Sequence, residues 1–286
     1  MYDNIVTIGK SKIQHGKNNN RIYLMHLHKD DYPTIIGKME SLASKNDYTK
    51  IFSKIPKWAI QSFAASGYIE EAVIPKFYYG KHDTHFFSKF INGSRANSDK
   101  LNQHKINKII QLAISKKDES LTSSLKPSLR MKVLNQSDIM KLAELYRRVF
   151  RSYPFPIFEQ EYLLETMNNN VLYMGVFSDN NLIAASSAEM DITSKNAEMT
   201  DFATLQDFRG NNLSLFLLNN MESEMFKRDI RTLYTIARSV SFGMNITFGR
   251  MGYKFAGTLV NNTHIAGKIE SMNVWYKHLT IPTRIK

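Results

Sequence analysis

The chain has 286 residues, is 43% hydrophobic and carries a formal net charge of +12, so it has enough material for two domains with packed cores. It contains no cysteine, which excludes disulfides, thiol nucleophiles and cysteine-ligated zinc. No apolar run reaches membrane-spanning length and the polar first ten residues lack a signal pattern, so we expect a cytoplasmic protein with no membrane partner.

The positive charge has two interpretations, a basic patch for nucleic acid or a lysine-rich surface with one anionic ligand site. No dense basic block, RNA-recognition motif or helix-turn-helix signature is present. A cofactor with several phosphates therefore accounts for the charge more economically, and we expect no nucleic-acid partner. The 8 histidines are scattered, so we also expect no metal.

Strands and helices alternate in the first half of the chain. Hydrophobic periodicity predicts strands at 21–27, 49–55, 70–75 and 84–90, and helices at 31–46, 56–67 and 100–116. The charged, serine-rich segment 117–128 is typical of a linker. We divide the chain accordingly into an N-terminal α/β domain at 1–93, a helical linker at 94–128 and a second domain at 129–286.

The second half begins with a predicted strand at 129–134 and a helix that Ser137 and Asp138 cap. Further helices are predicted at 159–168, 215–228 and 241–251, and further strands at 171–177, 182–191, 197–205, 232–238, 254–260 and 271–278. The fold class is therefore α/β, with a mixed sheet.

Two short segments of the first half have counterparts in the second. Phe63–Tyr68 parallels Phe248–Tyr253, and the aromatic pair before Lys89 parallels the pair before Lys277. The first domain is then a degenerate copy of part of the second. The alternative is that a helix followed by Gly-Tyr and a strand is simply a common helix ending.

The segment Gln206–Ser214 lies where a predicted strand gives way to a helix. Free backbone N–H groups and the positive end of the helix dipole suit phosphate at such a point. With this order of elements before it, the segment resembles the acetyl-CoA loop of the GNAT superfamily, whose pattern is Arg/Gln-x-x-Gly-x-Gly/Ala. Arg209 fits the first position, Asn212 replaces the first glycine and Ser214 replaces the second small residue. Asparagine tolerates a left-handed backbone, so the loop can keep its shape.

The resemblance implies a GNAT fold for residues 129–286 and acetyl-CoA as co-substrate. It assigns cofactor contacts to the preceding strand, to the loop, and to two positions where the family usually has Asn and Tyr. These residues are Phe202, Ala203, Thr204, Arg209, Gly210, Asn211, Asn212, Leu213, Ser214, Ser241 and Phe248.

A narrower resemblance runs over nearly the whole chain. Ile13–Lys17, Tyr153–Pro156, Gly257–Thr263 and Glu270–Lys277 are similar to segments of the β-lysine N-acetyltransferases. That family transfers acetyl to the ε-amine of β-lysine and so makes an osmolyte that accumulates under salt stress. The implied partner is a small amine.

Acetyl transfer needs a neutral amine, and a lysine-type amine has a pKa of ~10.4. The site therefore needs a base, a proton wire or strong desolvation of the amine. Glu198 and Asp201 are three apart, so they face opposite sides of a regular strand unless a bulge intervenes. We favour Asp201 as the base because it is nearer the loop, with a purely structural carboxylate as the alternative. Glu198 or Glu189 would instead hold a substrate ammonium group.

Direct attack by the amine is expected, since nothing supports an acyl-enzyme. Tyr276, Tyr234 or water would supply a proton to the departing thiolate. The expected substrate contacts are Tyr153, Phe155, Glu189, Asn261, Asn262, Glu270 and Asn273. Phe155 is also readable as core, and Asn261 with Asn262 as a β-turn.

Two other functions stay open from the sequence. One is a GNAT acetyltransferase for another small amine or a peptide. The other is a non-catalytic acyl-CoA-binding regulatory protein. A homodimer and closure of the N-terminal domain over the cleft are also left open.

Overall fold

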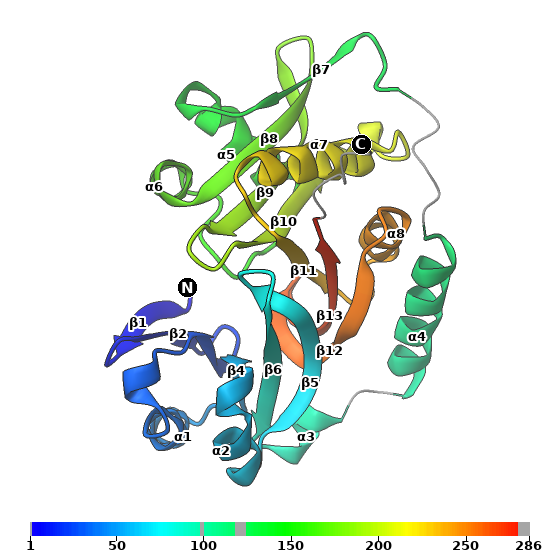
Figure 1. Cartoon of the computed structure of the whole chain (residues 1–286). Helices are drawn as coiled ribbons and strands as arrows, with labels where there is room; N and C mark the ends of the chain where they lie inside the picture. The colour runs from blue at the N-terminus through cyan, green and yellow to red at the C-terminus, as the bar shows by residue number, and fades with distance from the viewer. Residues whose placement is uncertain (1, 98–99, 118–123, 280–286) are drawn as a thin grey trace, which may run out of the picture.

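One mixed sheet runs through both halves of the chain in the computed structural model, which describes residues 2–97, 100–117 and 124–279 (Figure 1). The first half supplies β1 (Asn4–Ile8), β2 (Ser11–Gly16), β3 (Arg21–His26), α1 (Ile35–Lys45), β4 (Lys50–Pro56), α2 (Ile60–Ala65), β5 (Ile69–Tyr78) and β6 (His82–Phe90). The connection to the second half contains α3 (Gly93–Ala96) and α4 (Lys100–Ser115).

The second half begins with β7 (Leu129–Val133), α5 (Ile139–Val149) and α6 (Gln160–Asn169). It continues with β8 (Val171–Ser178), β9 (Asn181–Asp191), β10 (Asn196–Thr204), α7 (Leu213–Lys227), β11 (Thr232–Arg238), α8 (Phe242–Arg250), β12 (Lys254–Ile265) and β13 (Lys268–His278). The mixed α/β fold class is confirmed.

Apart from β7 at one edge, the strand order is a mirror-image repeat. In the described residues it reads β1-β2-β3-β4-β6-β5-β12-β13-β11-β10-β9-β8-β7. The series β1-β2-β3-α1-β4-α2-β5-β6 therefore repeats as β8-β9-β10-α7-β11-α8-β12-β13, with parallel pairing of β3 with β4 and of β10 with β11. The two copies meet where β5 pairs with β12, at Ala72 and Gly257. The expected internal repeat is confirmed, whereas the division at residues 93 and 128 stays a prediction.

The repeated sequence segments form the same side-chain cluster in each half. Lys277 pairs with Glu222 at 2.7 Å and lies over the ring of Tyr253. In the first half, Lys89 pairs with Glu40 at 2.8 Å and lies over the ring of Tyr68. Phe63 and Phe248 each make an edge contact with the corresponding tyrosine at 5.0 Å. The short sequence similarity therefore reflects a shared packing motif behind the sheet.

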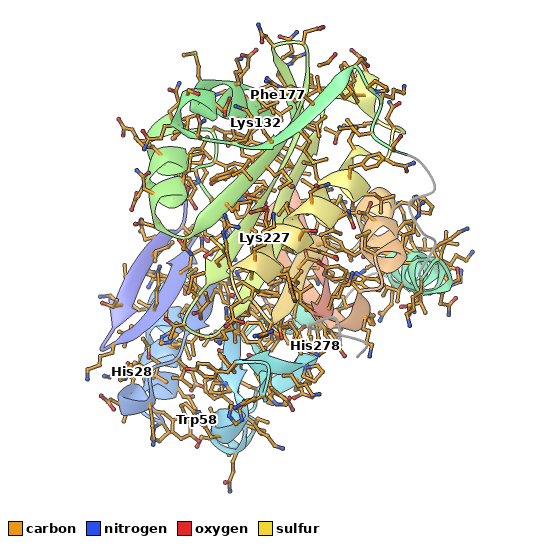
Figure 2. The ribbon with its side chains drawn as sticks, turned by 45° about the horizontal axis from the view of Figure 1, so that its top comes forward. His28, Trp58, Lys132, Phe177, Lys227 and His278 are labelled. Atoms are coloured by element: carbon orange, nitrogen blue, oxygen red, sulfur yellow. The ribbon has the colours of Figure 1, made fainter. Side chains whose placement is uncertain are left out.

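Strand alternation divides the sheet into two faces. Ala197 and Met199 of β10 pack in the core beneath α7 and α8, and Ile22 of β3 packs with α1 and α2. The opposite face carries an aromatic cluster that includes Tyr23 and Tyr234. Side chains fill the spaces on both sides (Figure 2). This aromatic face becomes the floor of the cavity described below.

Two sequence expectations need correction. Asn135 caps the 3-10 turn Gln136–Asp138 that leads into α5, since its side chain accepts the Ser137 N–H and Asp138 closes the capping box. Asp138 holds the N-cap position of α5 without a side-chain cap hydrogen bond, and Ser137 is not the cap. Asn261 and Asn262 do not form a β-turn, because they lie in a bulge of β12 between the pairs Leu259–Met272 and Thr263–Glu270. The sequence analysis also did not predict the edge hairpin of β1 and β2. The reason is that β1 is mostly exposed and has no alternation of buried and exposed residues.

The joint between the halves depends on Gly257. Its φ of 150° disfavours other residues, and an added Cβ would overlap the Glu71 carbonyl oxygen and lie 2.8 Å from Ala72 Cα. We expect Gly257→Ala to lower the free energy of unfolding by about 2–4 kcal/mol in urea titrations. The matched control is Gly37→Ala in α1, where a Cβ meets open space. This control should gain roughly 1 kcal/mol. Equal stability of the Gly257 variant and the unmutated protein would contradict this role.

Candidate active site

The parallel strands β10 and β11 separate partway along their length. They pair only from Asn196–Thr232 to Glu198–Tyr234. On its other side β10 has a register shift against β9 between Thr200 and Ala203, and Asp201 within it has a φ of 53°. The split leaves backbone groups of β10 and β11 without the partners that a continuous ladder would give them.

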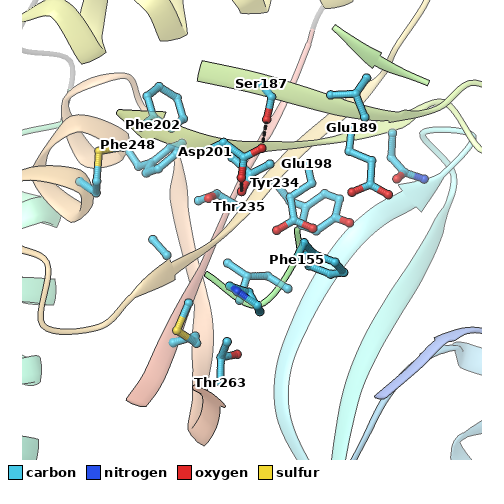
Figure 3. A pocket seen from close by; sticks show the side chains of 18 of the residues that line it. Phe155, Ser187, Glu189, Glu198, Asp201, Phe202, Tyr234, Thr235, Phe248 and Thr263 are labelled. Carbon is cyan, nitrogen blue, oxygen red and sulfur yellow. Dashed lines mark hydrogen bonds between the residues drawn. The ribbon is translucent and has the colours of Figure 1, made fainter. Parts of the chain in front are cut away.

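The bulge brings two carboxylates to one side of the sheet. In a regular strand Glu198 and Asp201 would face opposite sides. The inserted residue reverses the alternation, and both side chains line the same cavity. Figure 3 shows them with Glu189 of β9 around a shared space, and Phe155 faces this group from a loop.

The cavity has a volume of about 1910 Å³ and is shared by both halves. Its second-half wall consists of β9, β10, β11 and the first turns of α7 and α8, and its first-half wall includes Tyr23, Phe52 and Lys54. A cavity of this size exceeds what a small amine alone would occupy. It has room for a long cofactor and a substrate end to end.

Asp201 has several hydrogen-bond donors around it. One carboxylate oxygen accepts the Tyr153 hydroxyl and the Thr200 hydroxyl, and the other accepts the Ser187 hydroxyl at 2.5 Å. Burial raises the pKa of Asp201, and these hydrogen bonds oppose the rise. The arrangement fixes the Asp201 carboxylate and the Tyr153 ring in one orientation.

Glu198 is the acid whose protonation is balanced near neutrality. Burial, with a smaller contribution from the negative charge of Glu189, raises the pKa of Glu198 to about 7. Lys54 and a hydrogen bond from Tyr234 limit the rise. Burial also raises the pKa of Glu189. A carboxylate with a pKa near the working pH is suited to accept and release protons.

The predicted loop has the geometry of an anion site. Gly210 and Asn212 have φ values of 80° and 57°, and α7 begins directly after them at Leu213. The first N–H groups of this helix therefore open toward the cavity, together with Arg209 and Ser214. Phe248 lies across from Phe202, with 5.7 Å between the ring centroids.

Most of the predicted site residues line this one cavity. They are Glu198, Asp201, Phe202, Thr204, Arg209, Gly210, Asn212, Leu213, Ser214, Ser241, Phe248, Tyr153, Phe155, Glu189 and Asn262. Their assigned roles stay predictions, since lining a cavity does not identify a contact. The structure brings together segments that lie more than a hundred residues apart.

Six predicted residues do not line the cavity, and each has another environment. Ala203 is buried in the core, and Asn211 accepts a hydrogen bond from Lys126 at 3.0 Å. Tyr276 packs beside His278, with 5.3 Å between the ring centroids. The other three are held by neighbours in the β12–β13 region: Asn261 by the Arg95 carbonyl, Glu270 by Arg238 in a two-contact ion pair, and Asn273 by Thr258 and Asn245.

The sequence analysis missed the contribution of the first half to the cavity, which includes Tyr23 of β3 and Lys54 of β4. It also missed Ser187 of β9, in the second half. Alternation was the available signal, because Lys50, Phe52 and Lys54 share one face of a predicted strand whose other face carries Ile51 and Ile55. Nothing in the sequence indicates that this face meets the second half.

No helix in 2–97, 100–117 or 124–279 is long and apolar enough to cross a membrane. Over the same residues, no group of three or more His, Asp or Glu side chains is placed to hold a metal ion.

The chain was compared with known proteins. The model of the acetyltransferase (GNAT) family matches residues 139–253. A β-lysine N(6)-acetyltransferase from Methanococcus maripaludis is 40% identical, with 96% of this chain and 98% of the relative covered. One from Methanosarcina mazei is 31% identical, with 87% and 98% covered. N-acetyltransferase YodP from Bacillus subtilis is 36% identical, with 78% of each chain covered.

The Glu198 environment can be tested without any substrate. In a ¹³C carboxylate NMR titration, we expect Glu198 to titrate near pH 7, since burial disfavours its charged form. Tyr234→Phe removes the hydrogen bond that favours the carboxylate, so the midpoint should rise further. Glu198→Gln identifies the resonance by removing it. A midpoint near 4.5 in the unmutated protein would contradict the assignment.

Proposed function

Since this chain belongs to the β-lysine N(6)-acetyltransferase family of GNAT enzymes, we propose that it transfers the acetyl group of acetyl-CoA to the ε-amine of β-lysine. The chain is an N-acetyltransferase, and its similarity to the archaeal relatives extends over both halves. The observation that carries the proposal is the acidic cluster of Glu189, Glu198 and Asp201 at the split between β10 and β11. We further propose that the neutral-side-chain product serves as an osmolyte under salt stress.

The split and the α7 loop fit acetyl-CoA, which supplies an activated acetyl thioester. The backbone of Phe202 and Thr204 would bind the pantetheine arm in place of the missing β11 partners. Gly210, Asn212 and the first N–H groups of α7 would bind the pyrophosphate, with Arg209 adding positive charge. The edge-on pair of Phe202 and Phe248 forms an apolar wall beside this path.

Glu198, rather than Asp201, is our candidate for the general base. The oxygens of Asp201 already accept hydrogen bonds from Tyr153, Thr200 and Ser187, so it is committed to orienting its neighbours. Glu198 has a pKa of about 7, which leaves a large unprotonated fraction at neutral pH. Its carboxylate would accept a proton from the substrate ammonium group and leave a neutral amine for attack.

The departing thiolate also needs a proton. Tyr276 lies outside the cavity lining, whereas Tyr234 lines the cavity and hydrogen-bonds Glu198. We therefore propose that the proton first taken from the ammonium leaves Glu198 for water. The proton that the attacking nitrogen loses as the amide forms and the C–S bond breaks then reaches the thiolate through Glu198 and Tyr234, directly or through water. Burial and the adjacent carboxylate raise the pKa of Tyr234 well above its usual value, so it stays a protonated donor.

Acetylation of β-lysine by the purified chain, followed through release of the CoA thiol, tests this function. For Glu198→Gln we expect kcat/KM to fall by about 10²–10⁴-fold and the loss of activity below pH 7 to disappear from its pH profile. Asp201→Asn should keep that step in the profile, since Asp201 orients rather than accepts the proton. Absence of thiol release with β-lysine would refute the function, and an unchanged pH profile in Glu198→Gln would refute the base.

The loop gives a separate prediction about acetyl-CoA. Asn212 occupies a left-handed conformation that glycine adopts freely and a β-branched residue does not. Asn212→Gly should leave KM for acetyl-CoA within about 3-fold, whereas Asn212→Val should raise it at least about 10-fold. Initial rates at varied acetyl-CoA measure both. Similar KM values for the two variants would show that this backbone geometry is not used for binding.

A further inference from the structure

We propose that Lys54, in the first half of the chain, binds the substrate carboxylate and makes the enzyme select an amino-acid diamine over a simple diamine. This inference rests on the proposed function, because it concerns how the same cavity recognises the rest of β-lysine. It assigns a specificity-determining residue to the half that lacks a cofactor loop.

Lys54 projects from β4 into the cavity. It shares a strand face with Lys50 and Phe52, opposite the face that packs on α1 and α2. Its ammonium lies 5.6 Å from the Phe77 ring centroid and 5.8 Å from that of Tyr234. Since Tyr234 hydrogen-bonds Glu198, the Lys54 ammonium lies close to the cavity wall that carries Glu198.

The neighbouring cations of the first half are already engaged. Lys50 pairs with Glu71 at 2.9 Å and donates to the Val260 carbonyl at 2.7 Å. Arg21 donates to Thr263 Oγ1 at 3.1 Å and to the Asn262 carbonyl. By contrast, no carboxylate oxygen of the described residues lies within 4.0 Å of the Lys54 nitrogen, the limit for an ion pair. Burial lowers the pKa of Lys54. Lys54 is half-buried, and a partly desolvated ammonium without a close carboxylate suits an incoming anion.

The charge pattern around Lys54 matches β-lysine. Glu198, Glu189 and Asp191 are the acids whose charges act on Lys54. β-Lysine has an ammonium group at each end of a short methylene chain and a carboxylate beside one of them. With the ε-amine at Glu198, the second ammonium would lie toward Glu189 and the carboxylate toward Lys54. A simple diamine would leave Lys54 unpaired, which disfavours it.

The repeat shows that this lysine is particular to the first half. Lys54 pairs with Phe86 as Ile236 pairs with Val274, so the two residues hold equivalent places in the two copies. In the first half β3 and β4 pair from Arg21–Lys50 to Leu24–Ser53, one residue pair further than β10 and β11. The second copy therefore provides the loop before α7 for the cofactor, and the first copy provides a cation facing it.

Lys12 provides a matched control. It also lines the cavity and its charge acts on Glu189, but it lies exposed on the edge hairpin. Water screens a charge there, so a contact from Lys12 contributes less. Lys12→Met therefore removes a lysine from the same cavity and leaves Lys54 in place.

The test compares β-lysine with its carboxamide, which keeps both amines and loses only the negative charge. Calorimetric binding and initial rates are measured for the unmutated chain, Lys54→Met, Lys54→Arg and Lys12→Met, with thermal melts to confirm folding. We expect the unmutated chain to prefer β-lysine over the carboxamide by about 10–100-fold, as for one charge-assisted hydrogen bond. Lys54→Met should lose that preference, Lys54→Arg should keep part of it, and Lys12→Met should stay within about 3-fold of the unmutated chain.

The outcomes separate the two proposals. A carboxylate preference that disappears in Lys54→Met but not in Lys12→Met supports Lys54 even if no acetyl transfer occurs, in which case only the proposed function fails. If the unmutated chain acetylates β-lysine but Lys54→Met weakens β-lysine and its carboxamide equally, only the Lys54 role is overturned. Three other results would also overturn the Lys54 role. They are no preference for β-lysine in the unmutated chain, loss of that preference in Lys12→Met alone, and no binding of β-lysine.

Discussion

The early end of pairing between β10 and β11 is the constraint on which the rest of the structure depends. After the Glu198–Tyr234 pair the strands separate, and the bulge at Asp201 turns the following side chains. That local irregularity opens the sheet, leaves backbone groups of both strands without ladder partners and places two carboxylates in one cavity. A regular ladder would have satisfied these backbone groups internally and left no path between the strands.

The duplicated architecture gives this opening its floor and its far wall. Each half has the same order of elements, and the same Lys-Glu-Tyr cluster packs behind each sheet. In the first half β3 and β4 pair one residue further, and the equivalent face carries aromatic residues such as Tyr23 and Phe52. The joint at Gly257 holds these faces together, so a copy without a cofactor loop still shapes the substrate cavity.

Charge organises the cavity because burial makes each charge costly to leave unbalanced. Burial raises the pKa of Glu198 to about 7, and the negative charge of Glu189 adds to the rise. Asp201 instead accepts hydrogen bonds from Tyr153 and Ser187. Two carboxylates three residues apart therefore have different environments because their neighbours differ.

The sequence by itself determined the fold class, the main helices and strands, the repeat and the left-handed loop before α7. These follow from local periodicity and from Gly210 and Asn212, whose backbone preferences act within a few residues. It also identified Glu198 and Asp201 but assumed a regular strand between them. Only the tertiary structure decided that a bulge turns both inward, that Glu270 is committed to Arg238, and that Lys54 faces the site. Side-chain direction at a bulge and contacts between distant strands depend on partners that local sequence does not specify.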